Sequence, residues 1–245
     1  MMYPQWQRFI RLILIVEVLV GLIAVPPVLT AAPRPASLKT ITFNPPNRGA
    51  PGKTQDAGSR PACPTSVIPF TALVPATNWG ETIASHPTFW LYFPYDASAV
   101  ILTLRDEQTP ETVIYSTTFQ PSAAGIAQVP LPANAPALEV DRLYRWQFEF
   151  ICDAETQSHF QVTGVVVRRS PSTSFTEQLE AASPTEQVAL LAAHGFWHDT
   201  LTQLNQLRWA NPENPTLQAD WETLLQHPFV KLDALIAEPL IECCS

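Results

Sequence analysis

The chain has 245 residues, and 46% of them are hydrophobic, so it can bury a core in one large domain or two small ones. This composition excludes a collagen-like or wholly disordered chain. A formal net charge of −8 argues against nucleic acid as a partner, because phosphate binding requires clustered cations.

Residues 1–32 have the pattern of an export signal. Two arginines precede an apolar run over residues 12–25, and small residues follow as far as Ala32. This arrangement is typical of a secretory signal peptide. Pro33 lies directly after the expected cleavage point and hinders cleavage, so an uncleaved membrane anchor over residues 9–25 stays open as the alternative.

Residues 33–62 are rich in proline and glycine, and five cations in this segment face one acid. Such a composition buries too little apolar surface to offset its ordering entropy, which predicts a basic, mobile linker. Within it, residues 38–43 alternate like a strand that could pair with the edge of the following domain.

Residues 63–170 show the period of two that is typical of strands. Short strands at regular spacing, without helical patterns between them, predict an antiparallel β-sandwich that is Ig-like in size. The predicted strands cover residues 89–95, 100–106, 112–119, 125–131, 143–152 and 159–169.

Residues 171–245 change to a helical period, which makes the predicted fold class α+β. Ser183 precedes a proline, and Glu186 follows three positions later, which is typical of a helix start. Ten acids face only two cations, Arg208 and Lys231, in this region. The predicted helices cover residues 172–182, 184–194, 196–208, 215–226 and 231–237.

The second and third predicted helices resemble one tetratricopeptide unit, with Gly195 at the helix junction and Pro212 at the end. Thr200 departs from that pattern, which usually has alanine there. About three units are needed for a free-standing solenoid, so we expect one helical hairpin packed on itself or on the sandwich. Such hairpins more often bind polypeptides than catalyse reactions, and an ordinary bundle without a partner is the competing interpretation.

The cysteines fit an exported protein. Cys63 and Cys152 are expected to form a structural disulfide, and two free buried thiols are the alternative. The adjacent Cys243 and Cys244 allow a vicinal disulfide, a bridge between molecules, or reduced thiols.

No sequence motif indicates catalysis. His194 and His198 are four apart, but the predicted helix junction lies between them, so a metal site is disfavoured. Asp106, Glu107 and Glu111 share one hairpin turn, where a solvated loop is favoured over a catalytic carboxylate pair. The sequence therefore predicts no enzymatic activity and no cofactor.

Aromatic side chains supply the candidate interaction residues. Trp90 and Tyr92 share one face of a predicted strand, which would be exposed unless the helices cover it, the more common arrangement. On the helices, Trp197, Leu204 and Trp209 are candidate contacts or core residues.

Several segments at consistent spacing resemble the cyanobacterial "domain of unknown function 928" family. The resemblance runs from about residue 60 to residue 240, and it implies an exported cyanobacterial protein without implying an activity. The matching segments are 60–64 (RPACP), 73–75 (LVP), 86–90 (HPTFW), 92–95 (YFPY), 104–107 (LRDE), 144–146 (YRW), 152–153 (CD), 179–182 (LEAA) and 195–199 (GFWHD).

We therefore expect an exported protein that binds a protein partner in the periplasm or at the cell envelope through its acidic helices. The alternative is an envelope-polymer or carbohydrate-binding sandwich that stacks sugar rings on Trp90 and Tyr92. In either case we expect no nucleic-acid partner, and membrane contact only through an uncleaved amino-terminal segment.

Overall fold

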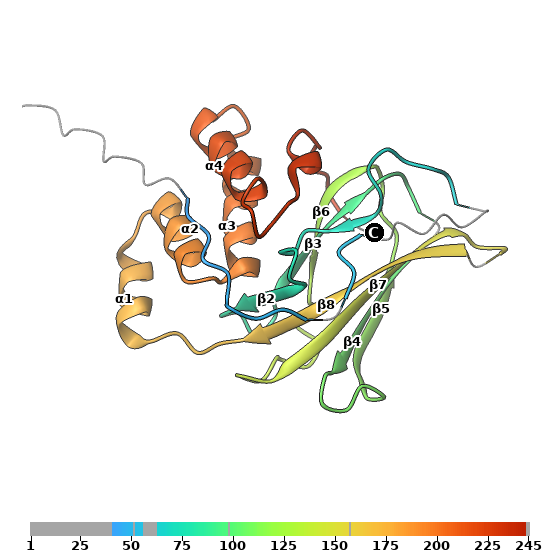
Figure 1. Ribbon diagram of the computed structural model, residues 1–245, viewed down its shortest axis with the longest axis horizontal. Coiled ribbons are helices and arrows are strands. Elements are labelled where there is room, and N and C mark those ends of the chain that lie inside the picture. Colours follow the sequence, from blue (N-terminus) through green and yellow to red (C-terminus); the bar gives the residue numbers. More distant parts are fainter. Residues whose placement is uncertain (1–40, 51, 56–62, 98, 157, 244–245) are drawn as a thin grey trace, which may run out of the picture. The chain divides into compact units, whose positions relative to one another are not determined.

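The computed structural model describes residues 41–50, 52–55, 63–97, 99–156 and 158–243, all within one compact unit that begins at residue 39. These residues form an α+β fold, with two sheets followed by helices (Figure 1). The strands are β1 Thr71–Ala72, β2 Trp79–Thr82, β3 Thr88–Phe93, β4 Ala99–Asp106, β5 Val113–Phe119, β6 Gly125–Pro130, β7 Leu143–Asp153 and β8 Ser158–Arg168. The helices are α1 Thr173–Ala181, α2 Pro184–Ala193, α3 Trp197–Ala210, α4 Pro215–Leu225 and the 3-10 helix η1 Asp233–Leu235.

The larger sheet has the order β2-β8-β7-β4-β5, and the smaller sheet has the order β1-β3-β6. All six predicted strands are confirmed within a few residues. The wholly antiparallel arrangement is wrong at one edge, because β2 pairs with β8 in parallel, with Trp79 opposite Val165. The sequence gives no signal for β2, since four residues are too short to show an alternating pattern.

The core forms where the two sheets contact each other through aromatic side chains. In β7, Trp146, Phe148 and Phe150 point to one face and are buried, as the alternating pattern predicts. From β3, Phe89 packs against Phe148 with ring centroids 5.6 Å apart, and Phe93 stacks on Phe150 at 6.1 Å.

The helices complete the same core rather than forming a separate one. Trp197 in α3 is fully buried, and its indole nitrogen donates a hydrogen bond to the Leu73 carbonyl oxygen at 2.8 Å. One continuous cluster of buried residues includes both strand and helix side chains. The predicted boundary at residue 170 is therefore a change of secondary structure inside one compact unit.

The expectation of a mobile linker is wrong for residues 41–50. Ile41 and Phe43 are buried, and the Phe43 ring packs edge-on against Trp197 at 5.0 Å. The Asn44 amide donates to the Ala192 carbonyl oxygen at 3.1 Å. The two buried side chains anchor a segment whose composition is otherwise that of a linker, and residues 41–43 form no strand.

The geometry of the junction between α2 and α3 explains why residue 195 is a glycine. Gly195 has a φ of +78°, and a Cβ atom there would lie 2.7 Å from the Asn44 carbonyl oxygen. Both the left-handed backbone and the close approach require glycine. Thr200, buried one turn later, donates its hydroxyl to the Phe196 carbonyl oxygen at 2.8 Å, which satisfies this polar side chain inside the core.

The helix starts are predicted better than the end of the chain. The Ser183 amide donates to the Glu186 carboxylate at 2.9 Å, which confirms the start of α2. The helix predicted over residues 231–237 is wrong, since only the 3-10 turn η1 forms there. Lys231 adopts a φ of +59°, a left-handed conformation that interrupts a helix.

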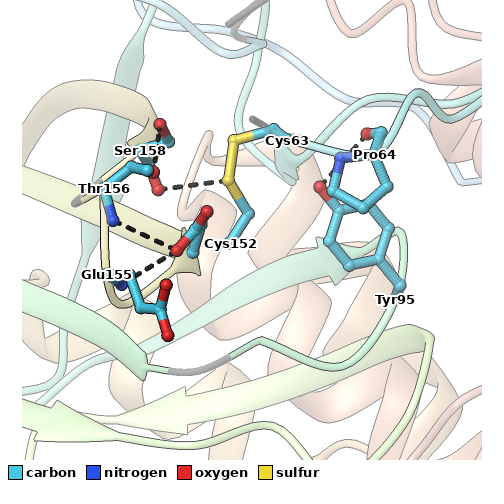
Figure 2. Close-up of a disulfide and its surroundings, with 8 residues drawn as sticks. Cys63, Pro64, Tyr95, Cys152, Glu155, Thr156 and Ser158 are labelled. Atoms are coloured by element: carbon cyan, nitrogen blue, oxygen red, sulfur yellow. Dashed lines mark hydrogen bonds between the residues drawn. A yellow bond between two sulfur atoms is a disulfide. The ribbon is translucent and has the colours of Figure 1, made fainter. Parts of the chain in front are cut away.

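The predicted disulfide is confirmed. Cys63 is bonded to Cys152, with the two Cα atoms 5.5 Å apart and a sequence separation of 89 (Figure 2). Beside the bridge, the Tyr95 hydroxyl donates to the Pro64 carbonyl oxygen at 3.2 Å. The bridge thus ties the start of the described 63–97 segment to the end of β7. Cys243 is disulfide-bonded as well.

Candidate functional site

The structure buries four of the five predicted interaction residues. Trp90 and Tyr92 are 6% and 5% exposed, and Trp197 and Leu204 are fully buried. The helices cover the outer face of β3, where the Trp90 indole donates to the Thr202 hydroxyl at 3.2 Å. The hypothesis that Trp90 and Tyr92 form an exposed aromatic face is therefore wrong, and Trp197 and Leu204 are core residues.

Trp209 differs from the other four because it is 50% exposed. It lies in the last turn of α3 and lines a pocket of about 330 Å³, which we call the Trp209 pocket. The end of α3, the start of α4 and the segment after η1 form its walls. The lining residues are 208–209, 211–212, 214, 218 and 238–240.

Arg208 supplies the positive charge of the Trp209 pocket. Its guanidinium carbon lies 4.2 Å from the ring centroid of Trp221, a fully buried residue of α4. One terminal nitrogen donates to the Asn205 side-chain oxygen at 2.8 Å, and the other donates to the Gln218 side-chain oxygen at 3.4 Å. Burial lowers the pKa of Arg208 to about 10, so the group stays charged at neutral pH.

Glu238, in the segment after η1, brings a negative charge to the wall of the same pocket. It accepts a hydrogen bond from the Tyr92 hydroxyl, and burial together with this carboxylate raises the pKa of Tyr92. The Asn214 side chain caps α4 by accepting the Thr216 amide at 3.0 Å. The pocket therefore combines an arginine, an exposed indole, amide side chains and one carboxylate that is already engaged.

A second concave site, the Asp199 groove, lies where α1, α2 and α3 meet the loop between β2 and β3. Its volume is about 380 Å³, and its walls include Leu179, Leu191 and Gln203. Asp199, in the first turn of α3, accepts the Ile83 amide at 3.0 Å. Burial raises the pKa of Asp199 to about 6, although hydrogen bonds from the loop partly offset this.

His198 lies beside Asp199 and packs into the core. Its ring meets Phe89 edge-on at 5.3 Å, and a Cβ atom on Gly80 would lie 2.3 Å from its Nε2 atom. Burial lowers the pKa of His198 to about 4, and a backbone hydrogen bond with Thr88 offsets only part of that effect. His198 is therefore a neutral core residue at physiological pH.

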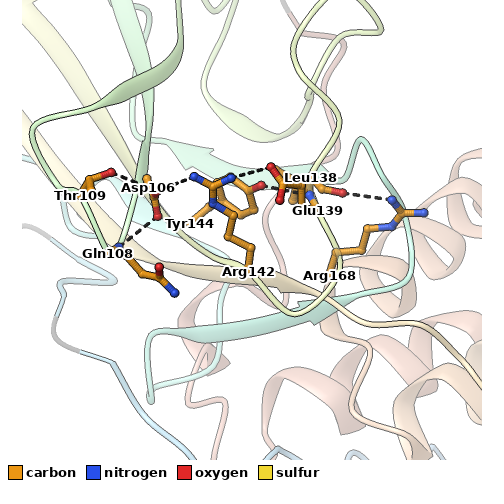
Figure 3. Close-up of polar contacts among 8 residues, drawn as sticks. All are labelled: Asp106, Gln108, Thr109, Leu138, Glu139, Arg142, Tyr144 and Arg168. Atoms are coloured by element: carbon orange, nitrogen blue, oxygen red, sulfur yellow. Dashed lines mark hydrogen bonds and ion pairs between the residues drawn. The ribbon is translucent and has the colours of Figure 1, made fainter.

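The carboxylates of the β4–β5 turn are occupied by arginines. Asp106 is buried, and its Oδ2 atom accepts from Arg142 at 2.6 Å and from the Thr109 hydroxyl at 3.0 Å (Figure 3). Hydrogen bonds from Arg142 and the turn hold the pKa of Asp106 below its ordinary value. Glu107 pairs with Arg145. Asp106 and Glu107 thus belong to a structural ion-pair network, whereas residues 108–111, with Glu111, are exposed as expected for a solvated loop.

His194 and His198, four positions apart in sequence, are separated in the fold. The Nδ1 atom of His194 lies 2.9 Å from the Leu190 carbonyl oxygen and its ring packs on Phe175, whereas His198 faces Gly80. Within the described ranges, no three histidine, cysteine or acidic side chains gather as a metal site would require. None of the helices in the described part of the chain has the length and hydropathy of a membrane span. The expected signal or anchor over residues 1–32 lies outside the described residues.

The fold and its pockets define an α+β protein whose concave surfaces lie on and beside a carboxy-terminal helical region. Residues 55–240 match the family described as Domain of Unknown Function (DUF928), and the chain belongs to this family. No curated protein matches the chain.

The sequence pattern points to Trp209 but misses its pocket. Arg208, Asn205 and Gln218 come from two helices, and only the packing of α3 against α4 brings them together. One signal was visible: Arg208 is one of two cations among ten acids in residues 171–245. With Lys231 as the only other cation in that acidic segment, Arg208 is a candidate binding residue.

Proposed function

We propose that this protein is an exported, non-enzymatic module that binds another protein at the cell envelope, using the Trp209 pocket as its contact surface. The observation that carries the proposal is the half-exposed Trp209 beside Arg208 in a concave site. Tryptophan and arginine are the residue types most enriched among those that dominate binding energies, and such residues cluster in pockets.

Two observations support an oxidising, extracytoplasmic location. The Cys63–Cys152 disulfide is of a kind that persists in such compartments and is rare in the cytosol. The pattern of residues 1–32 is that of a signal peptide, with an anchor over residues 9–25 as the alternative. A cyanobacterial source, implied by the sequence resemblance, is part of the same proposal.

The finer description of the fold is also a proposal. We interpret the two sheets as a sandwich because the aromatic side chains of β3 pack on those of β7. We interpret α2 and α3 as one tetratricopeptide-like hairpin because Gly195 allows their tight junction.

An envelope polymer is the second candidate ligand, but at a different place from the one first expected. Trp90 and Tyr92 are buried and cannot stack on a sugar ring. Trp209, with Asn211 and Gln218 in the same pocket, offers an exposed ring and amide groups instead. The exposed ring is common to both candidates, so the experiment must tell a protein from a polymer.

The test is site-specific photo-crosslinking in native envelope extracts. A photoreactive phenylalanine analogue replaces Trp209 in one sample and Phe229 in a control, since Phe229 is similarly exposed at 53% and lies outside the pocket. We expect one saturable protein adduct from position 209, competed by unlabelled protein. Adducts from position 229 alone, or a polymer adduct at 209, would contradict the proposal.

A further inference from the structure

Arg208 is held in one orientation by contacts with residues that are themselves buried or hydrogen-bonded. Trp221, on which the guanidinium stacks, and Asn205, which accepts one of its hydrogen bonds, are both fully buried. Gln218 accepts a second hydrogen bond and donates its own amide to Glu222 at 3.1 Å. The fork of the arginine is therefore preorganised, which reduces the entropy lost when a ligand binds.

Among the described residues, the charge of Arg208 has no carboxylate partner. Arg142, Arg145 and Arg169 each pair with carboxylates, whereas Arg208 has none within 4.0 Å among the residues that the structure describes. Its acceptors are two neutral amide oxygens. Partial burial of a cation without a counter-charge is unfavourable, and the lowered pKa of Arg208 reflects this desolvation.

Hydrogen-bond donors also exceed acceptors at this site. A guanidinium carries five N–H groups, and Arg208 uses two of them within the described chain. Arg208 is only partly buried, so the remaining N–H groups can reach a ligand in the pocket. A cation with unused donors favours an anionic acceptor, and the planar guanidinium matches a carboxylate in a bidentate geometry.

Glu238 limits what can bind. It lines the same pocket, accepts the Tyr92 hydroxyl, and lies beyond ion-pair distance of Arg208. Its charge repels an anion, so it weakens binding without occupying the arginine. A ligand must therefore gain contact area elsewhere, and the exposed indole of Trp209 next to Arg208 offers it.

We propose that Arg208 binds a carboxylate of the partner polypeptide, while Trp209 packs against the neighbouring part of that chain. This inference rests on the proposed protein-binding function and adds the chemistry of the partner. The carboxylate belongs to an acidic side chain or to a chain terminus, and both present the same group to the guanidinium.

The test uses arrays of random decapeptides probed with the fluorescently labelled oxidised protein. One set has free carboxyl termini, a second has amidated termini, and a third is amidated with every acid replaced by its amide. Polygalacturonate and dextran spots test an acidic and a neutral polymer. The variants are Arg208→Gln, Arg208→Lys and Glu238→Gln.

We expect retention by the first or second set and loss on the third. Arg208→Gln should weaken retention about 10-fold or more. Arg208→Lys should retain the peptides at a level between Arg208→Gln and the wild type, because an ammonium group cannot donate two parallel hydrogen bonds to a carboxylate. Glu238→Gln should strengthen retention, which no folding defect can imitate. If retention occurs on the first set alone, the carboxylate is that of a chain terminus.

Other results would overturn the inference in distinguishable ways. Equal retention on all three peptide sets would refute the carboxylate and leave the protein-binding function standing. Retention on polygalacturonate without any peptide, or on no spot at all, would refute both. Unchanged retention by Arg208→Gln would show that the carboxylate binds elsewhere.

Discussion

Asp199 accepts a hydrogen bond from the Ile83 amide at 3.0 Å, which joins the first turn of α3 to the loop between β2 and β3. The neighbouring His198 is buried against Gly80 and Phe89. Two adjacent titratable residues thus lie where the helices meet the sheets, and their pKa values shift in opposite directions from their ordinary values.

These opposed shifts predict compensating pH dependences. The pKa of His198 falls from 6.5 to about 4, so its contribution to stability is lost as the pH drops through that window. The pKa of Asp199 rises from 3.8 to about 6, so the folded state gains stability as the pH drops from about 6 to 4. Between about pH 4 and 6 the two contributions largely cancel.

Replacing Asp199 removes one side of this compensation. In Asp199→Asn, the free energy of unfolding should fall by about 2 kcal/mol more than in the wild type between pH 6.5 and 4.5. His198→Gln is the opposite variant: its free energy of unfolding should rise by about 2 kcal/mol relative to the wild type over that range, because only the Asp199 contribution remains. Urea denaturation at the two pH values measures both, and parallel profiles for the three proteins would refute the linkage.

The Cys63–Cys152 bridge should contribute a large part of the stability, because it closes a loop of 89 positions. Replacing both cysteines by serine should lower the free energy of unfolding by about 4 kcal/mol in the chain-entropy treatment. Urea denaturation under oxidising conditions measures the difference, and either single serine variant serves as a control that should match the double one. A loss below about 1 kcal/mol would show that the unfolded chain is already restricted.

Gly195 should be intolerant of any side chain. Gly195→Ala places a Cβ atom 2.7 Å from the Asn44 carbonyl oxygen at a φ of +78°, and it should cost about 2 kcal/mol or more. Gly49→Ala is the matched control: it is exposed, and its nearest atom would lie 3.4 Å away. That variant should change stability by less than about 0.5 kcal/mol. Equal thermal midpoints for the two variants would contradict the account of the junction.

The sequence predicts the fold best where one pattern decides the structure. The alternation of apolar and polar residues in β7 predicts which face is buried, because every second residue contacts the opposite sheet. The start of α2 is readable because Ser183 and Glu186 satisfy backbone groups locally. Both features depend on neighbours in the chain, and so does the strand pairing between β7 and β8.

Features that depend on distant contacts are not readable in this way. The composition of residues 41–50 is that of a linker and does not predict the burial of Ile41 and Phe43. Their burial depends on helices more than 140 positions later in the chain. β3 carries apolar residues on both faces, which fits either an exposed surface or a second covering layer. The Trp209 pocket likewise exists only after α3 and α4 have packed.

The shared core also decides how the function must be tested. Trp197 and Phe43 tie the helices and the amino-terminal segment into one cluster with the strands. A chain truncated at residue 170 would expose that cluster, so its loss of binding would report unfolding. Point variants at exposed positions avoid this ambiguity.

The most direct test is the dissociation constant for the partner crosslinked at position 209, measured with purified proteins by calorimetry. Trp209→Ala should weaken binding about 30-fold, the effect of losing a central aromatic contact, without changing the thermal midpoint. Phe229→Ala should bind like the wild type. Equal affinities for the wild type and Trp209→Ala, or a loss confined to Phe229→Ala, would contradict a contact surface at the Trp209 pocket.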